Sequence, residues 1–197
     1  MYEVPQHLGR TGDNNFSAMD KPVLEKYCFK KLTLDIGCSN GDVVKYLRDN
    51  GTAAYGVDGD VNAVRKFSDE SVRPYLICHD YTQGKSHLRH EVDVAISTDF
   101  VEHVAEKYID NYMKDFLLAN TVILHTPPEG TPGHHHVNTQ NADYWILLFA
   151  QYGMELHDEM TTEARKISGY HNPRDMAYFH KHPDILPKNN YLVFVKK

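Results

Sequence analysis

The segment LDIGCSNG, residues 34–41, has the residue types of a turn that binds a nucleotide. An apolar run, KLTLDI, precedes the turn, and the segment after it, DVVKYLRDNG, has apolar residues at helical spacing. The glycines therefore lie between a strand and a helix, where Gly37 lets the backbone approach a ligand and Gly41 lets the helix begin close to it. We expect any side chain at position 37 to intrude into the ligand's volume. The expected contacts are Gly37, Cys38, Ser39, Asn40 and Gly41.

Two carboxylates flank this turn and indicate which nucleotide it binds. Asp58 ends the next apolar run, YGVD, from where a carboxylate accepts hydrogen bonds from both hydroxyls of a ribose. Asp35 precedes the turn, where its charge repels a pyrophosphate and attracts an ammonium group. The spacing G-x-x-x-G also differs from the G-x-G-x-x-G pattern of dinucleotide sites. The residues thus favour S-adenosylmethionine over a nicotinamide dinucleotide.

A second group of reactive residues occurs in STDFVEHV, residues 97–104. Because residues three and four apart share one face of a helix, we expect Asp99, Glu102 and His103 to converge on one point. Such a group binds a divalent cation or takes a proton from an acceptor. The segment GHHHVN, residues 133–138, follows a later strand, and we expect His135 to face Glu102 and His103. Three interpretations stay open: metal ligands, a general base or acceptor contact, and a purely structural role.

The elements that must position these residues alternate between strands and helices. Alternation of this kind is typical of a doubly wound α/β fold, with a mostly parallel seven-stranded sheet and helices on both faces. The stretch before the last strand is polar and has no clear helical face, so we expect no helix there and one antiparallel strand at that end of the sheet. Strands are predicted at KLTLDI, AAYGVD, YLICHD, VDVAIST, NTVILHT, MELHDEM and NYLVFVKK, and helices at DVVKYLRDNG, VNAVRKFSDE, VEHVAEKYIDNYMKDFLL and NADYWILLFAQYG.

Length and composition set further limits. The 197 residues suit one domain, predicted at residues 21–197, and residues 1–20 have no periodicity and are expected to form a flexible arm. The net charge of −6, without a basic block, disfavours binding of a long nucleic acid. Three cysteines, at positions 28, 38 and 78, are expected to be free thiols in a reducing compartment. No signal segment or long apolar run is visible, so we expect a cytoplasmic protein that does not span a membrane.

The sequence DIGCSNG followed by GVD resembles the first two motifs of the class I, Rossmann-like S-adenosylmethionine-dependent methyltransferases, and the likeness extends from Leu32 to about Met154. The resemblance implies that the turn holds the methionine end of the cofactor and that Asp58 binds the ribose. An acidic residue after the third strand often contacts adenine in this family, although at that place an aspartate can also cap a turn. Ser39 stands where the family usually has a glycine. The other residues that the resemblance places at the cofactor are Asp35, Asp80, Tyr81, Ser97 and Thr98.

The group DFVEH, residues 99–103, resembles the E-x-x-E-H cluster of methyltransferases that bind a divalent metal, with Asp99 in place of the first glutamate. The predicted function is transfer of a methyl group from S-adenosylmethionine to a hydroxyl or amine of a small molecule, with Glu102, His103 and His135 as catalytic residues. Asp99, Glu102 and His103 are the candidate metal ligands. Two alternatives stay open: an RNA cap or RNA-end methyltransferase, and a module that binds S-adenosylmethionine without catalysis. The sequence also leaves a homodimer open.

Overall fold

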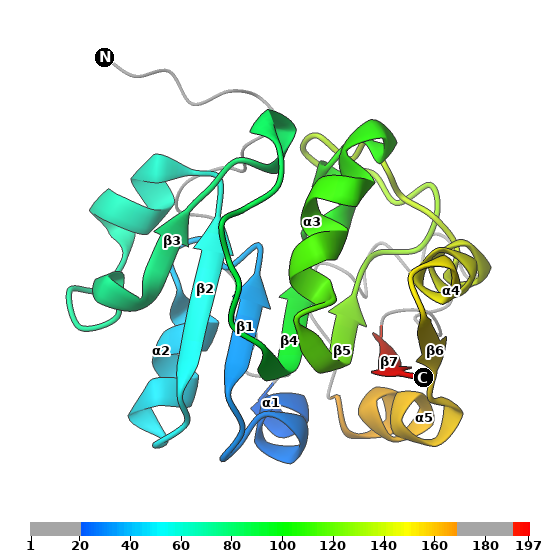
Figure 1. The fold of residues 1–197 in the computed structure, drawn as a ribbon, viewed down its shortest axis with the longest axis horizontal. Helices are drawn as coiled ribbons and strands as arrows, with labels where there is room; N and C mark the ends of the chain where they lie inside the picture. Colours follow the sequence, from blue (N-terminus) through cyan, green and yellow to red (C-terminus); the bar gives the residue numbers. More distant parts are fainter. Residues whose placement is uncertain (1–20, 169–190) are drawn as a thin grey trace.

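The computed structural model describes residues 21–168 and 191–197, and these form a single sheet with helices on both faces (Figure 1). The strand order is β3-β2-β1-β4-β5-β7-β6. Strands β1 to β5 are parallel, whereas β7 is antiparallel to both β5 and β6. This arrangement confirms the expected doubly wound sheet and its antiparallel end. The strands are β1 Thr33–Ile36, β2 Ala54–Asp58, β3 Leu76–Cys78, β4 Val92–Thr98, β5 Ala119–His125, β6 Met154–Leu156 and β7 Tyr191–Lys196.

The helices divide into two layers, one on each face of the sheet. Apolar residues of α1, α2 and α5 form one buried cluster with the sheet, and those of α3 and α4 form the other. In strand β5, Val122 and Leu124 face the α3–α4 layer, while Ile123 faces the opposite layer. Because both faces of the strand are buried, its sequence is a nearly continuous run of apolar residues. The α-helices are α1 Lys21–Tyr27, α2 Asp42–Asp49, α3 Ile109–Phe116, α4 Ala142–Gln151 and α5 Asp158–Ile167.

The long helix expected over residues 101–118 is broken, so that prediction was wrong in its first half. The chain forms two 3₁₀ helices, Val101–His103 and Glu106–Tyr108, before α3 begins at Ile109. The backbone carbonyl of Glu102 accepts hydrogen bonds from the amides of Val137 and Asn138, at 2.9 and 3.1 Å. These bonds from a distant loop replace the bond that a continuous helix needs at this carbonyl.

Two other elements differ from the prediction. The polar stretch for which no helix was expected contains α5, whose buried residues are the small side chains Thr161 and Ala164. A face made of such residues gives little apolar periodicity, which explains the error. The helix expected over residues 61–70 is reduced to a π-helix, Ala63–Phe67, because the hydroxyl of Ser68 binds the carbonyl of Val64 at 2.6 Å and the chain then becomes extended.

Some expectations fall on residues outside the described ranges, among them the flexible arm at residues 1–20. In the described part of the chain, none of the helices has the length and apolar character needed to cross a membrane. Cys28, Cys38 and Cys78 are free thiols, as expected.

The stacked pair Phe149 and Phe194 joins α4 to β7 and provides a test of the core. Their ring centroids lie 4.1 Å apart with 5° between the ring planes, and both side chains are fully buried. Phe149→Ala is expected to lower the free energy of unfolding by about 3–5 kcal/mol, because it removes buried apolar surface and leaves a cavity. Leu147→Ala is the matched control, since Leu147 lies on the same helix with 66% of its surface exposed. Its effect in urea denaturation should stay within about 0.5 kcal/mol, and equal losses for both variants would contradict this placement of α4.

Candidate functional site

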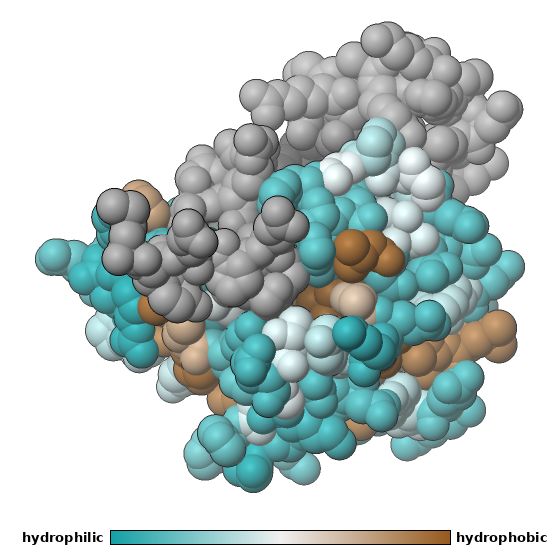
Figure 2. Space-filling model, turned by 90° about the horizontal axis from the view of Figure 1, so that it is seen from above, coloured by the Kyte–Doolittle hydropathy of each residue, from teal (hydrophilic) through white to brown (hydrophobic). Residues whose placement is uncertain are grey.

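The carboxyl ends of the parallel strands meet at one edge of the sheet, and the segments singled out from the sequence follow these ends. Figure 2 views the molecule from this side; the visible surface is mainly hydrophilic, with a small apolar area near its middle. The glycine turn leaves β1, and the amides of Gly37 and Cys38 donate to the carbonyl of Val57 on β2, at 2.9 and 3.1 Å. Gly37 and Gly41 both have φ of +84°, in the left-handed region that favours glycine. The turn is thus built as the sequence predicts.

The space beside Gly37 is occupied by the protein itself. A Cβ atom at this position would overlap the Cβ and ring atoms of Phe100, which follows β4. We expected a side chain at position 37 to intrude into the ligand's volume. In the structure such a side chain would instead meet Phe100. The glycine is needed because Phe100 packs on the turn and because the backbone is left-handed.

Asp58 is held in a fixed orientation at the end of β2. Its Oδ2 accepts a hydrogen bond from the amide of Ser39 at 2.8 Å, and its Oδ1 accepts one from the amide of Asp60 at 2.7 Å. Burial raises the pKa of Asp58, and these two amide bonds oppose that rise. A carboxylate has about four lone-pair sites, so beside the backbone bonds from Ser39, Asp60 and Gly59 it can still accept from a ribose hydroxyl.

Asp35 lies in β1 with 4% of its surface exposed. Burial and the charge of Asp58 raise its pKa from 3.8 to about 8. A ligand with a positive charge at this place would stabilise the ionised carboxylate and lower that pKa. The electrostatics of the turn therefore suit an ammonium or sulfonium group and oppose a diphosphate.

Asn40 and Asp80 fix backbone close to the expected cofactor site. The Oδ1 of Asn40 accepts from the amide of Asp42 at 3.3 Å. Asp80 caps the 3₁₀ helix Tyr81–Gln83 by accepting from the amide of Thr82 at 2.8 Å, as the alternative interpretation of Asp80 proposed.

Of three further residues expected at the cofactor, Tyr81 and Ser97 have their hydroxyls bonded within the protein, whereas Thr98 does not contradict the expectation. Tyr81 is 3% exposed and its hydroxyl donates to Asp115 at 2.6 Å, so its polar end points into the protein. The fully buried Ser97 donates to the carbonyl of Ile36 at 2.8 Å and ties β4 to β1. Thr98, the last residue of β4, is partly exposed at the edge where the acceptor is expected.

Asp99 is paired with a histidine outside the group in which the sequence placed it. Its backbone is left-handed, with φ of +49°, and its Oδ1 accepts a hydrogen bond from Nδ1 of His125, at the end of β5, at 3.0 Å. His125, with smaller contributions from His103 and His136, lowers the pKa of Asp99, whose side chain is 49% exposed. Asp99 therefore joins the ends of β4 and β5, and it is not part of the group described next.

Glu102, His103 and His136 form the closest group of potential metal ligands in the described residues. One ligand atom from each lies within 4.8 Å of the others. The rings of His103 and His136 are 5.0 Å apart, and Nε2 of His103 lies 3.9 Å from Oε1 of Glu102. His136, not the expected His135, completes this group. A run of three histidines gives no period from which the inward-facing member could be chosen.

The tautomer of His136 is fixed by its surroundings. Its Nδ1 lies 2.9 Å from the carbonyl oxygen of Thr131, which can only accept, so Nδ1 carries the proton and Nε2 keeps a lone pair. Hydrogen bonds of this kind orient histidine ligands around metal ions. The same loop is held over the group by the bonds to the carbonyl of Glu102 described above.

Burial controls the protonation of the group. Burial, and then the charge of Asp99, raises the pKa of Glu102 well above its usual value. Burial and the nearby His136 lower the pKa of His103 to about 4, so its imidazole is neutral at pH 7. This pKa lies further from neutral pH than is ideal for a general base, which departs from the expectation for His103.

Buried polar atoms without a hydrogen-bond partner gather in this part of the molecule. Such atoms are rare in folded proteins, because each costs free energy unless a ligand, an ion or water satisfies it. Here they lie on the segments that follow β4 and β5, and on the helices α3 and α4. In the described ranges they include Oε1 and Oε2 of Glu102, Nδ1 of His103, Oγ1 of Thr126, Nδ2 of Asn138, the hydroxyl of Tyr112 and Nε1 of Trp145.

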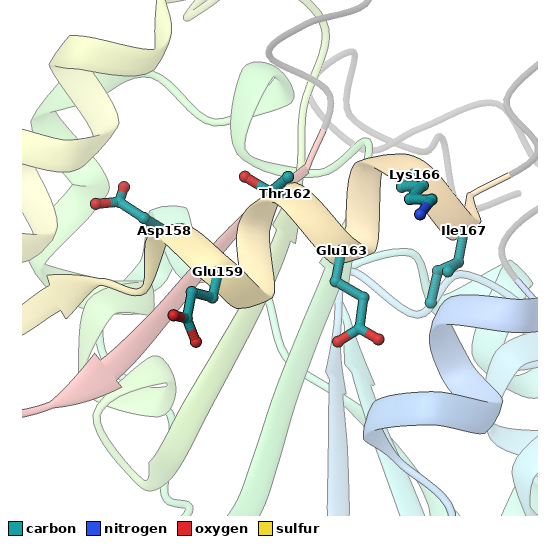
Figure 3. Close-up of a pocket in the computed structure, with 6 residues that line it drawn as sticks. All are labelled: Asp158, Glu159, Thr162, Glu163, Lys166 and Ile167. Carbon is teal, nitrogen blue, oxygen red and sulfur yellow. The ribbon is translucent and has the colours of Figure 1, made fainter.

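Neither of two hollows in the described part of the chain is lined by Glu102, His103 or His136. One, of about 600 Å³, runs along α5 (Figure 3), where Glu163 binds Tyr27 and Lys26 of α1. The other, of about 500 Å³, lies between the start of α3 and α4 and is lined in part by Glu106 and Leu147. Neither is lined by a residue expected to bind the cofactor.

Comparisons with known proteins agree with this fold. Residues 34–117 match the family model described as "Methyltransferase domain". The fold is similar to that of a SAM-dependent methyltransferase from Archaeoglobus fulgidus, with a TM-score of 0.60 and 14% identity over 91% of this chain and 92% of that one. It is similar to a TehB-like SAM-dependent methyltransferase from Corynebacterium glutamicum, with a TM-score of 0.61 and 14% identity over 94% and 90% of the two chains.

A third similar structure is a magnesium protoporphyrin IX methyltransferase from Synechocystis with bound SAH, with a TM-score of 0.55 and 17% identity over 71% of each chain. Comparison with curated protein sequences gave no match. The family match agrees with the predicted class of enzyme, and the similar structures confirm the predicted fold.

Gly37→Ala tests the packing of the turn. Both the left-handed backbone and the overlap with Phe100 oppose the new Cβ, so we expect a loss of stability beyond the roughly 1–2 kcal/mol that left-handed backbone costs alone. Gly51→Ala is the matched control, because Gly51 has φ of +76° with open space around it. Urea denaturation of both variants measures the difference. Equal losses would show that Phe100 does not pack on the turn.

The raised pKa of Asp35 predicts that binding of S-adenosylhomocysteine depends on pH. In the free protein the carboxyl is largely protonated below pH 8, and an ammonium ligand requires it ionised, so binding releases a proton and the affinity rises with pH up to about 8. The Kd should fall about tenfold between pH 6 and pH 7 in calorimetric titrations. Asp35→Asn should bind more weakly and without this dependence. A wild-type affinity that is constant from pH 6 to 8 would refute the assignment.

Proposed function

We propose that this chain, a class I S-adenosylmethionine-dependent methyltransferase, transfers the methyl group to a hydroxyl or amine of a small-molecule acceptor bound beside Glu102, His103 and His136. The observation that carries the proposal is the gathering of unpartnered buried polar atoms around these residues. A protein that only held the cofactor would have no need of such a group beside the glycine turn. The net charge of −6 supports a small acceptor over an RNA.

The cofactor supplies a methyl group on a sulfonium, and the reaction is an in-line displacement. The bond between the acceptor atom and the methyl carbon forms as the bond between carbon and sulfur breaks, and the electron pair of the broken bond stays on sulfur. The protein must align the two partners, which contributes roughly 7–11 kcal/mol to lowering the barrier. It must also receive the proton that a hydroxyl or ammonium acceptor gives up. We assign this role to neutral His103, whose Nδ1 is buried and unpartnered, although its lowered pKa makes the imidazole a weak base.

A divalent cation fits the same group. The carboxylate of Glu102 and the ring nitrogens of His103 and His136 would hold it, and this mixture of imidazole and carboxylate suits manganese, iron, nickel or zinc. A bound cation would lower the proton affinity of an acceptor oxygen. The bond from His136 to Thr131 supplies the orientation that such a ligand needs. Asp99 is left out of this proposal, because it is paired with His125.

The acceptor class is tested by measuring S-adenosylhomocysteine formation by mass spectrometry with two sets of acceptors. One set contains small phenols, catechols and amines, and the other contains capped and 3′-hydroxyl RNA oligonucleotides. We expect turnover with a member of the first set. Turnover with RNA alone would overturn the proposed acceptor, and cofactor binding without turnover would favour the non-catalytic alternative. His103→Ala is expected to lower kcat/KM about 100-fold, whereas the exposed neighbour His134→Ala should leave it unchanged.

The metal site is tested independently of turnover by titrating the metal-free protein with Mn²⁺ in a calorimeter. The wild type is expected to bind one ion. Glu102→Gln and His136→Ala should each raise the Kd about 100-fold or more, because each removes one of three ligands. His134→Ala is the control. The metal site would be excluded if the wild type bound no ion, or if Glu102→Gln bound Mn²⁺ as tightly as the wild type. Either result would leave the proposed role of His103 as proton acceptor unaffected.

A further inference from the structure

The connection between β3 and β4 is held in place by side chains of α3. After its single 3₁₀ turn, the connection runs past α3 without another helix (Figure 1). Asn111 donates to the carbonyl of Tyr81 at 2.7 Å. Asp115, one turn further along α3, accepts a hydrogen bond from the hydroxyl of Tyr81 at one carboxylate oxygen and from the hydroxyl of Ser86 at the other, both at 2.6 Å.

Asp115 is an unusual residue for such a task, because its side chain is fully buried. A buried carboxylate is costly unless its oxygens are hydrogen-bonded, and here each oxygen has one short bond from a hydroxyl. Burial and the charge of Asp115 raise the pKa of Tyr81 well above its usual value, so its hydroxyl stays a donor. The pair is thus a charge-assisted bond shielded from water.

Tyr81 connects Asp115 with both ends of the cofactor site. It directly follows Asp80, the residue expected at the adenine. Its ring packs edge-on against Phe100, with centroids 5.7 Å apart. Phe100 in turn packs on Gly37 of the glycine turn. A movement of the Tyr81 side chain would therefore shift Asp80 on one side and the packing of the turn on the other.

We propose that Asp115 is a positioning residue for the cofactor: through its bond to Tyr81 it fixes Asp80 for the adenine and seats Phe100 against the glycine turn. The proposal rests on the assignment of Asp80 to the adenine end. It gives α3, none of whose own residues is expected at the cofactor, a part in cofactor affinity. Without the bond between Tyr81 and Asp115, the conformation that binds the cofactor becomes one of several. The apparent Kd then equals the intrinsic Kd divided by the fraction of molecules in that conformation.

Tyr81→Phe tests the proposal by removing one hydroxyl while the ring that packs on Phe100 remains. Tyr27→Phe is the matched control, because Tyr27 is also a buried tyrosine whose hydroxyl binds a carboxylate, that of Glu163, but in the opposite layer. Tyr81→Phe should lose more stability in urea denaturation, because it leaves an oxygen of the buried Asp115 unpartnered, whereas Glu163 is partly exposed and keeps its bond to Lys26. In calorimetric titrations with S-adenosylhomocysteine, only Tyr81→Phe should raise the Kd, by about tenfold.

Two variants of Asp115 separate positioning from general support of the fold. Asp115→Asn keeps an acceptor for the hydroxyl of Tyr81 and a donor for Ser86, so its Kd for S-adenosylhomocysteine should stay within about threefold of the wild type. Asp115→Ala should raise the Kd at least as much as Tyr81→Phe. Hydrogen exchange of the amides of residues 82–84 should quicken in Tyr81→Phe and slow again when the ligand is bound. If Asp115→Ala does not fold, the comparison of Tyr81→Phe with Tyr27→Phe tests the proposal without it.

Three outcomes overturn the proposal. In the first, Tyr81→Phe binds S-adenosylhomocysteine within twofold of the wild type. In the second, Tyr27→Phe weakens binding as much as Tyr81→Phe, which reduces the effect to lost stability. In the third, the wild type itself does not bind, which refutes the cofactor assignment together with this proposal. Wild-type binding that Tyr81→Phe leaves unaffected refutes the role of Asp115 alone.

Discussion

The site depends on two carboxylates, Asp35 and Asp58, that are held together beside a glycine turn. Asp58 is fixed by two backbone amides, and its charge contributes to a pKa of about 8 for Asp35. Burial of like charges is unfavourable, and a ligand that brings a positive charge relieves it. The turn, the strand ends and the packing of Phe100 all keep this arrangement in place. A sulfonium nucleoside with an amino-acid end meets the requirement, whereas a dinucleotide with a diphosphate does not.

The acceptor side follows a different principle. Here the polar groups are unpartnered, and the loop after β5 covers them through two hydrogen bonds to the carbonyl of Glu102. Those bonds also break the helix after β4, so one interaction both shapes the chain and places Glu102 and His103 beside His136. Asp99 pairs with His125, and its charge still raises the pKa of Glu102. The two halves of the site thus meet at the ends of β1 and β4, where Ser97 binds the carbonyl of Ile36.

The features that the sequence predicts well are local ones. A strand, a glycine turn and a helix within about twenty residues can be recognised from their spacing alone, and so can Asp58 at the end of the next strand. The packing of Phe100 on Gly37, the bond from Tyr81 to Asp115 and the choice of His136 over His135 depend on contacts between distant segments. Helix α5 escaped prediction because Thr161 and Ala164 form its buried face. The break after β4 arises from amides more than thirty residues further along the chain.

The central claim is that the turn selects a positively charged nucleoside, and calorimetry with three ligands tests it most directly. S-Adenosylhomocysteine carries an ammonium group, 5′-deoxy-5′-methylthioadenosine has the same adenosine end without it, and NAD carries a pyrophosphate. The account predicts that the first binds at least about tenfold more tightly than the second, because hydrogen bonds to charged groups contribute about 1.5–3 kcal/mol, and that NAD does not bind. Equal affinity for the first two ligands, or tighter binding of NAD, would contradict it.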